Sequence, residues 1–220
     1  AAVQEQHRFV FADFARAYQV HKPRKRFAGV YGVKYKPFFL RHERYGLKPF
    51  LGGLRRLENA GADILLMPCN TAHYFYPAIQ ASTKCPILHM LRLTAEEIKS
   101  RGHIKVALLA TDGTVKTGIY AKLFEEYGID YMLPEPEEQR LVMSMIYDGI
   151  KADNEQYFDT EPIKAALRAM QQRGADAFVL GCTELPIAFD DFELDFPTVD
   201  PTRVLAKNAV LAAGYELKTK

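Results

Sequence analysis

Apolar residues recur at two different spacings along the chain. The segment 49–61, "PFLGGLRRLENAG", repeats them at helical spacing and closes at Gly61, a residue type that commonly ends helices. The next run, "ADILLMP" at 62–68, is short and continuously apolar, which is typical of a strand buried on both faces. Helices that alternate with such strands predict an α/β fold with mostly parallel sheets.

The same alternation continues to the end of the chain. Helices are predicted over 71–82, 94–102, 114–128, 137–151, 161–174 and 201–214, and strands over 86–90, 105–113 and 175–181. Thr94 is the expected cap of its helix, because threonine side chains often accept a hydrogen bond from the first helical turn.

An internal repeat organises these elements. The stretch "LRRLENAGADILLMPCNTA" from Leu54 aligns without a gap with "LRAMQQRGADAFVLGCTEL" from Leu167, 113 positions later, and in both a cysteine falls eight residues after the Gly of Gly-Ala-Asp. Two helix–strand–Cys units predict two pseudo-symmetric Rossmann-like or flavodoxin-like lobes with a cleft between them. The predicted lobes are 1–95, on which the helix at 201–220 packs back, and 96–200.

Composition narrows the class of protein. The chain is 48% hydrophobic and 25% charged, as in ordinary globular proteins, and no apolar run approaches the roughly 20 residues that span a membrane. The first ten residues lack a signal-peptide core, and three cysteines do not make a disulfide framework, which favours the cytoplasm.

Charge is unevenly distributed around a net value of +2. Residues 1–56 carry a net charge of +10, and the remainder carries −8. The densest basic stretch, "HKPRKR" at 21–26, has no nucleic-acid-binding motif beside it. We interpret it as a solvated basic loop and expect neither a nucleic-acid nor a membrane partner.

Cys69 and Cys182 are each predicted at the carboxyl end of a strand, just before a helix. Unpaired N–H groups and the helix dipole there favour anions, can lower the pKa of a thiol, and can hold a substrate carboxylate. Singly, each cysteine is also compatible with a small buried hydrophobe. As a pair on opposite walls, one thiol can remove a proton from carbon while the other returns one. Cys85 has no counterpart in the repeat and is interpreted as structural.

These segments carry a family resemblance. The stretches "PCNTAH", "GCTELP", "KVALLATDGTVKTGIY" and "MIYDGIKADN" resemble the aspartate/glutamate racemase superfamily, most closely its cofactor-independent aspartate racemases. Glutamate racemases typically have a His directly after the second Cys-Thr, where this chain has Glu184. The resemblance implies a homodimeric racemase that interconverts L- and D-aspartate by a two-base mechanism without pyridoxal phosphate or a metal.

The resemblance also assigns residues. Cys69 and Cys182 match the two catalytic cysteines. The positions that it implies for substrate binding are Asn70, Thr71, Thr111, Thr114, Lys151, Thr183 and Glu184, with Arg41 or Arg44 for the distal carboxylate. Residues 1–45 do not match the first strand and Gly-rich loop of the family.

Several alternatives remain open at this point. One is racemisation or isomerisation of another small acid, such as glutamate, a hydantoin or maleate. Another is a non-catalytic protein that binds dicarboxylates. A metal site from Cys69, His73, Cys182 and Glu184 is disfavoured because no dense Cys/His spacing supports it. A decarboxylase relative is disfavoured, because it would need only one of the two thiols.

Overall fold

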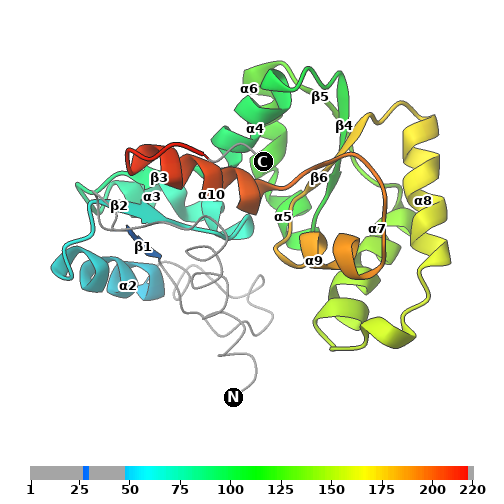
Figure 1. Ribbon diagram of the computed structural model, residues 1–220, viewed down its shortest axis with the longest axis horizontal. Coiled ribbons are helices and arrows are strands. Elements are labelled where there is room, and N and C mark those ends of the chain that lie inside the picture. The colour runs from blue at the N-terminus through cyan, green and yellow to red at the C-terminus, as the bar shows by residue number, and fades with distance from the viewer. Residues whose placement is uncertain (1–26, 30–47, 218–220) are drawn as a thin grey trace. The chain divides into compact units, whose positions relative to one another are not determined.

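The computed structural model describes residues 27–29 and 48–217 (Figure 1). The chain folds into two compact units. The first holds the described residues up to Met67 together with Phe75–His89 and the chain from Leu205, and the second holds Pro68–Tyr74 and Met90–Val204. All strand pairs in both units are parallel, which confirms the predicted α/β class.

The first unit contains a three-stranded sheet. Its strands lie in the order β1 (Phe27–Gly29), β2 (Ile64–Leu66) and β3 (Ile87–Leu88). The helices are α2 (Lys48–Asn59), α3 (Tyr76–Gln80) and most of α10 (Pro201–Ala212). Leu54 of α2 and Leu65 of β2 are fully buried, so the apolar stripe of this helix and the continuous apolar strand are both used in packing.

The second unit contains a four-stranded sheet in the order β5-β4-β6-β7. The strands are β4 (Lys105–Leu109), β5 (Asp130–Met132), β6 (Ala177–Leu180) and β7 (Thr198–Val199). From β4 the chain goes first to β5 on one side and then returns to β6 on the other. The strand order therefore reverses between β4 and β6, and α/β sheets bind ligands beyond the carboxyl ends of strands at such a point.

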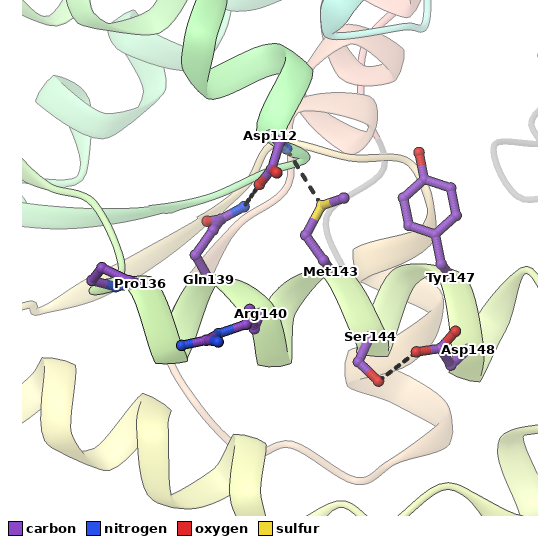
Figure 2. A pocket seen from close by; sticks show the side chains of 8 residues that line it. All are labelled: Asp112, Pro136, Gln139, Arg140, Met143, Ser144, Tyr147 and Asp148. Carbon is purple, nitrogen blue, oxygen red and sulfur yellow. Dashed lines mark hydrogen bonds between the residues drawn. The ribbon is translucent and has the colours of Figure 1, made fainter. Parts of the chain in front are cut away.

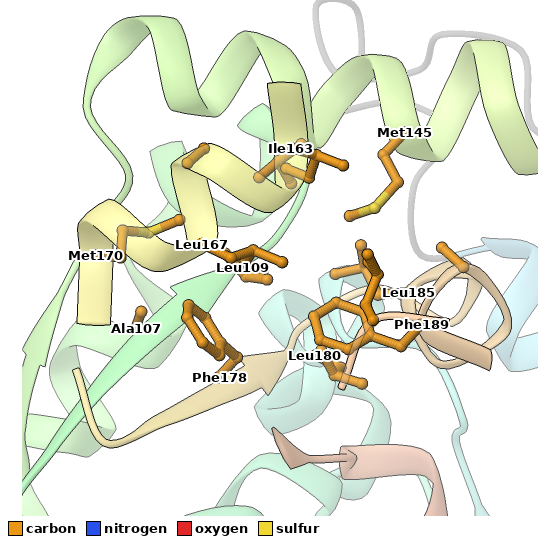
Figure 3. Close-up of a cluster of buried hydrophobic side chains, with 14 of the residues drawn as sticks. Ala107, Leu109, Met145, Ile163, Leu167, Met170, Phe178, Leu180, Leu185 and Phe189 are labelled. Carbon is orange, nitrogen blue, oxygen red and sulfur yellow. The ribbon is translucent and has the colours of Figure 1, made fainter. Parts of the chain in front are cut away.

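Helices cover both faces of this second sheet (Figure 1). The helices α4 (Met90–Ser100) and α6 (Ile119–Tyr127) lie on one side, and α7 (Pro136–Ser144) and α8 (Glu161–Gln172) on the other. Figure 3 shows Ile163, Leu167 and Met170 of α8 pointing toward the side chains of β4 and β6. Their spacing of four and three residues places them on one face of the helix, so the helical period of the sequence builds this core.

The sequence repeat corresponds to a structural repeat. Helix α2 leads to β2, and helix α8 leads to β6. Both turns contain the glycine of Gly-Ala-Asp in a left-handed conformation, with φ of 78° at Gly61 and 100° at Gly174. The two helix–strand–Cys units are confirmed. The cleft between two pseudo-symmetric lobes, and the lobe boundary at residue 95, stay predictions; residues 68–74 and 90–95 cluster with the second unit.

Some predicted boundaries were wrong. Helix α4 begins at Met90, and Thr94 is a buried interior residue whose hydroxyl donates to the Met90 carbonyl at 2.8 Å instead of capping the helix. The predicted helix at 114–128 is divided by Gly118 into α5 (Asp112–Thr117) and α6. The helix at 137–151 continues beyond α7 as a π-helix, Met145–Ile150. The helix at 71–82 begins as a 3-10 helix, Thr71–Phe75.

Four short elements were not predicted, namely β1, β5, β7 and a 3-10 turn at Glu155–Tyr157. Each has only two or three residues, and none stands in a continuous apolar run of the kind that marks β2, β4 and β6. Within 27–29 and 48–217, no helix combines the length and apolar character that crossing a membrane requires.

Gly181, directly after β6, lies close to the end of β4. Its N–H donates to the Leu109 carbonyl at 2.7 Å, and a Cβ at this position would lie 2.9 Å from that carbonyl oxygen and 3.0 Å from the Ala110 Cβ. We expect Gly181→Ala to lower the free energy of unfolding by about 1–3 kcal/mol, because the backbone must shift to admit the methyl group. Urea unfolding followed by circular dichroism measures this.

Gly52→Ala is the matched control. Gly52 is exposed within α2, and a Cβ there meets nothing within 4 Å. This substitution should stabilise the protein by up to about 1 kcal/mol through helix propensity. Unchanged stability in Gly181→Ala would contradict the close approach.

Candidate active site

The segment that carries Cys69 is fixed to α5 and α6. After β2 the chain passes Met67 and Pro68 and enters the 3-10 helix, and the part from Pro68 to Tyr74 belongs to the second unit. The Tyr120 hydroxyl donates to Asn70 Oδ1 at 2.6 Å, and the hydroxyl oxygens of Thr71 and Thr114 are 2.7 Å apart. Both contacts hold residues next to Cys69 against the helices that follow β4.

His73 supports the backbone of Cys69. The Met90 N–H donates to His73 Nε2 at 3.1 Å, so the ring proton is on Nδ1, which donates to the Cys69 carbonyl 2.8 Å away. His73 is 4% exposed. Both ring nitrogens are therefore engaged, and among the described residues no group of three or more His, Cys, Asp or Glu is arranged to hold a metal ion.

The loop after β4 is held by α7. Thr111 caps α5 by accepting from the Thr114 N–H, and Thr114 is fully buried. Gln139 donates to the Ala110 carbonyl at 3.0 Å and to Asp112 Oδ1 at 2.9 Å. Figure 2 shows this side chain reaching Asp112 in a recess lined by α7, the π-helix and the start of α5. Thr111 thus lies in the fixed loop after β4, and Thr114 lies in the first turn of α5.

Cys182 is joined to an ion pair at the carboxyl end of β6. Its thiol donates to Glu184 Oε2 at 2.9 Å, and Lys151 Nζ lies 2.9 Å from Glu184 Oε1. The Thr183 hydroxyl also donates to Glu184 Oε2, at 3.0 Å. Glu184 begins α9 (Glu184–Asp191), so the predicted helix follows this cysteine. Lys151, Cys182, Thr183 and Glu184 form one polar cluster.

The cluster sets the protonation of the thiol. Burial raises the pKa of Cys182 well above its usual value, and the charge of Glu184 and its hydrogen bond to the thiol add to this, while Lys151 opposes it. Burial would also raise the pKa of Glu184, but Lys151 and the hydrogen bonds to its carboxylate outweigh burial and lower that pKa. The resting arrangement is a neutral thiol beside a charged carboxylate and a charged ammonium.

The expectation of a lowered thiol pKa at the strand end was therefore wrong for Cys182. A helix N-terminus favours an anion, but a carboxylate 2.9 Å from the sulfur disfavours a second negative charge more strongly. Burial acts in the same direction because a thiolate loses more hydration than a thiol.

The π-helix positions Lys151. The Lys151 N–H donates to the Ile146 carbonyl at 3.0 Å, a five-residue spacing that an α-helix does not have. Its ammonium lies 5.1 Å from the ring centroid of Tyr147, which lines the recess of Figure 2. Lys151 therefore contacts an acidic partner and an aromatic ring at once.

The predicted site residues fall into two connected groups. The first is Cys69, Asn70, Thr71, Thr111 and Thr114, and the second is Cys182, Thr183, Glu184 and Lys151. Tyr120 belongs to the first group, because its hydroxyl donates to Asn70 Oδ1. Arg41 and Arg44 lie outside the described residues. No pattern in the sequence indicated the roles of Tyr120 and Tyr147. The partner of Tyr120 lies 50 positions away, and the contact of Tyr147 with Lys151 depends on the local π-helix.

Comparison with known proteins identifies the family. The model for Asp/Glu/Hydantoin racemases matches residues 41–209, more than half of the chain, so the chain belongs to this family. The broad specificity amino-acid racemase RacX of Bacillus subtilis is 29% identical over 163 residues, which cover 74% of this chain and 70% of that protein.

Two further relatives bear on the substrate. The aspartate racemase of Picrophilus torridus has a similar structure, with a TM-score of 0.69 and 29% identity, covering 82% of this chain and 74% of that chain. A glutamate racemase of Persephonella marina is 26% identical over 145 residues, which cover 64% of this chain and 53% of that protein. The chain thus spans about half of that glutamate racemase.

Glu184→Gln should make the Cys182 thiol more reactive. The substitution removes the negative charge that helps to raise the pKa of Cys182, and it leaves the Lys151 ammonium to stabilise a thiolate. We expect alkylation of Cys182 by iodoacetamide at mildly alkaline pH to become severalfold faster, as measured by mass spectrometry of the cysteine peptides, with Cys85 as the internal reference.

Lys151→Met should have the opposite effect. It removes the charge that opposes the raised pKa and should slow alkylation of Cys182 relative to Cys85. Changes of the same sign in the two variants would contradict the electrostatic explanation.

Proposed function

We propose that this member of the Asp/Glu/hydantoin racemase family interconverts L- and D-aspartate without a cofactor, with Cys69 and Cys182 acting on opposite faces of the α-carbon. The observation that carries the proposal is the pair of strand-end thiols from the internal repeat, both within the second unit and both next to polar side chains. The family relationship supports an amino acid as the substrate.

The proposed reaction consists of two proton transfers. When Cys69 is the base, its thiolate takes the α-proton, and the electron pair of the broken C–H bond stays on the α-carbon. The Cys182 thiol then donates its proton to the opposite face, which inverts the centre and leaves Cys182 as the thiolate. In the reverse direction the two groups exchange roles.

The Lys151–Glu184 pair suits the second of these steps. In the resting state Glu184 keeps Cys182 protonated, so a proton is ready for delivery. After delivery, the Cys182 thiolate lies near Glu184, and the Lys151 ammonium offsets part of the repulsion between the two negative charges. Glu184 and Lys151 thus hold a proton at Cys182 and stabilise its loss.

Carboxylate binding is assigned to the hydroxyl and amide groups beside the cysteines. Asn70 and Thr71 follow Cys69, Thr114 contacts Thr71, and Thr183 follows Cys182. Neutral donors and backbone N–H groups suit an α-carboxylate, because they add no negative charge near the thiols. Arg41 or Arg44 remains our proposal for the distal carboxylate.

Aspartate is the proposed substrate, and a broader range is the second candidate. The aspartate racemase of Picrophilus torridus and the Glu184 position support the first. The broad specificity racemase of Bacillus subtilis supports the second. A non-catalytic dicarboxylate binder is the alternative of a different class, and the homodimer stays a prediction.

Isotope exchange tests the reaction. The protein is incubated with L-aspartate in deuterated water under reducing conditions, without added cofactor, and the products are resolved by chiral chromatography and mass spectrometry. We expect D-aspartate that carries deuterium at the α-carbon. Cys69→Ala and Cys182→Ala should each lower the racemisation rate by roughly 10²- to 10⁴-fold, because each removes one proton-transferring group.

Cys85→Ser is the matched control. The Cys85 thiol donates to the Ala62 carbonyl, and both residues belong to the first unit, whereas Cys69 and Cys182 belong to the second. It should keep the wild-type rate. Aspartate binding without any α-proton exchange would favour the binder, and equal rates across glutamate and neutral amino acids would favour broad specificity.

A further inference from the structure

Asn70 uses only one end of its side-chain amide within the described part of the chain. Its Oδ1 accepts the hydrogen bond from Tyr120 at 2.6 Å. Its Nδ2 is buried and has no hydrogen-bond partner among the described residues. The residue is 3% exposed, so water does not reach the amide freely. An unpaired buried donor is unfavourable, which points to an acceptor that arrives with a ligand.

Tyr120, whose hydroxyl reaches Asn70, is buried and tightly packed. It lies on α6 with 1% exposure, and its ring packs against Phe124 with centroids 5.3 Å apart. Burial strongly raises the pKa of this hydroxyl, and the charge of Asp200 adds to the effect. The hydroxyl therefore stays protonated and donates.

A donating hydroxyl fixes the direction of the amide. Only the carbonyl oxygen of an asparagine side chain accepts hydrogen bonds, so the Tyr120 bond selects one of the two amide orientations. In that orientation the NH₂ group turns away from Tyr120. Asn70 follows Cys69 directly in the sequence, so this donor belongs to the segment that carries the first thiol.

We propose that Tyr120 is a positioning residue that orients the Asn70 amide so that its NH₂ group donates to the substrate carboxylate. The inference rests on the proposed function, since it names a residue for the same site. Tyr120 does not touch the substrate, and its effect is transmitted entirely through Asn70. Removing the Tyr120 hydroxyl should therefore affect the reaction only while Asn70 is present.

A double-mutant cycle tests the proposal. Kinetics with aspartate are measured for wild type, Tyr120→Phe, Asn70→Ala and the double variant. Tyr120→Phe should lower kcat/KM about tenfold, mainly by raising KM, as expected for losing a hydrogen bond to a charged group. In the Asn70→Ala background the same change should alter kcat/KM by less than about twofold. An equal effect in both backgrounds would overturn the proposal.

Tyr127→Phe is the matched control. Tyr127 is on the same helix, and its hydroxyl donates to Glu96 at 3.2 Å on the exposed surface. The variant loses one hydroxyl and one hydrogen bond without touching the site, so kcat/KM should be unchanged. Thermal unfolding of each variant reports whether the fold is retained.

A second measurement separates this inference from the proposed function. Isothermal titration calorimetry measures the affinity of the same four proteins for succinate, which cannot be racemised. If wild type binds succinate but does not exchange the α-proton of aspartate, the proposed function fails and the affinities decide the role of Tyr120. If wild type neither binds nor exchanges, both are overturned.

Asn70→Asp provides a variant that does not depend on the folding of Tyr120→Phe. A carboxylate still accepts from the Tyr120 hydroxyl but has no N–H to donate. It should lose at least tenfold in succinate affinity, and thermal unfolding measures whether the fold accepts the buried carboxylate. Wild-type affinity in Asn70→Asp would overturn the assignment of the amide as a donor.

Discussion

The hydrogen bonds that join residues 68–74 to α5 and α6 are the contacts on which the candidate site depends. Cys69 follows a strand of the first sheet, and Cys182 follows a strand of the second. The contacts of Thr71 with Thr114 and of Asn70 with Tyr120 nevertheless make the first cysteine part of the same unit as the second. Both strand-end cysteines thereby belong to one compact unit.

The two cysteines have different surroundings despite their matching positions in the repeat. Cys182 contacts a carboxylate that favours the thiol, whereas Cys69 is followed by neutral Asn70 and has its carbonyl bound by neutral His73. The repeat explains why both thiols are at strand ends. Burial and the charge of Glu184 explain why Cys182 favours the protonated thiol. A protonated Cys182 suits the proposed reaction, in which one group acts as the base and the other as the acid at each turnover.

The sequence predicted the parts of the structure that follow from local pattern. Strands β2, β4 and β6 were recognisable because continuous apolar runs signal burial on both faces, and the repeat located both cysteines at strand ends. The prediction that Thr94 caps a helix was wrong. A threonine before a helical pattern often caps the helix, but here the Thr94 hydroxyl donates to the Met90 carbonyl within α4. The pairing of Asn70 with Tyr120 spans 50 positions and has no periodic signal. The raised pKa of Cys182 depends on the carboxylate position of Glu184, which the residue type alone does not fix.

Bridging of the two thiols tests the central claim that Cys69 and Cys182 serve one small ligand. In a Cys85→Ser background only these two cysteines remain. The protein is treated with dibromobimane, which becomes fluorescent when it links two neighbouring thiols, and is then digested and analysed by mass spectrometry. We predict one intramolecular bridge between the Cys69 and Cys182 peptides, suppressed by aspartate. Single modification of each cysteine without a bridge, unaffected by aspartate, would contradict the account.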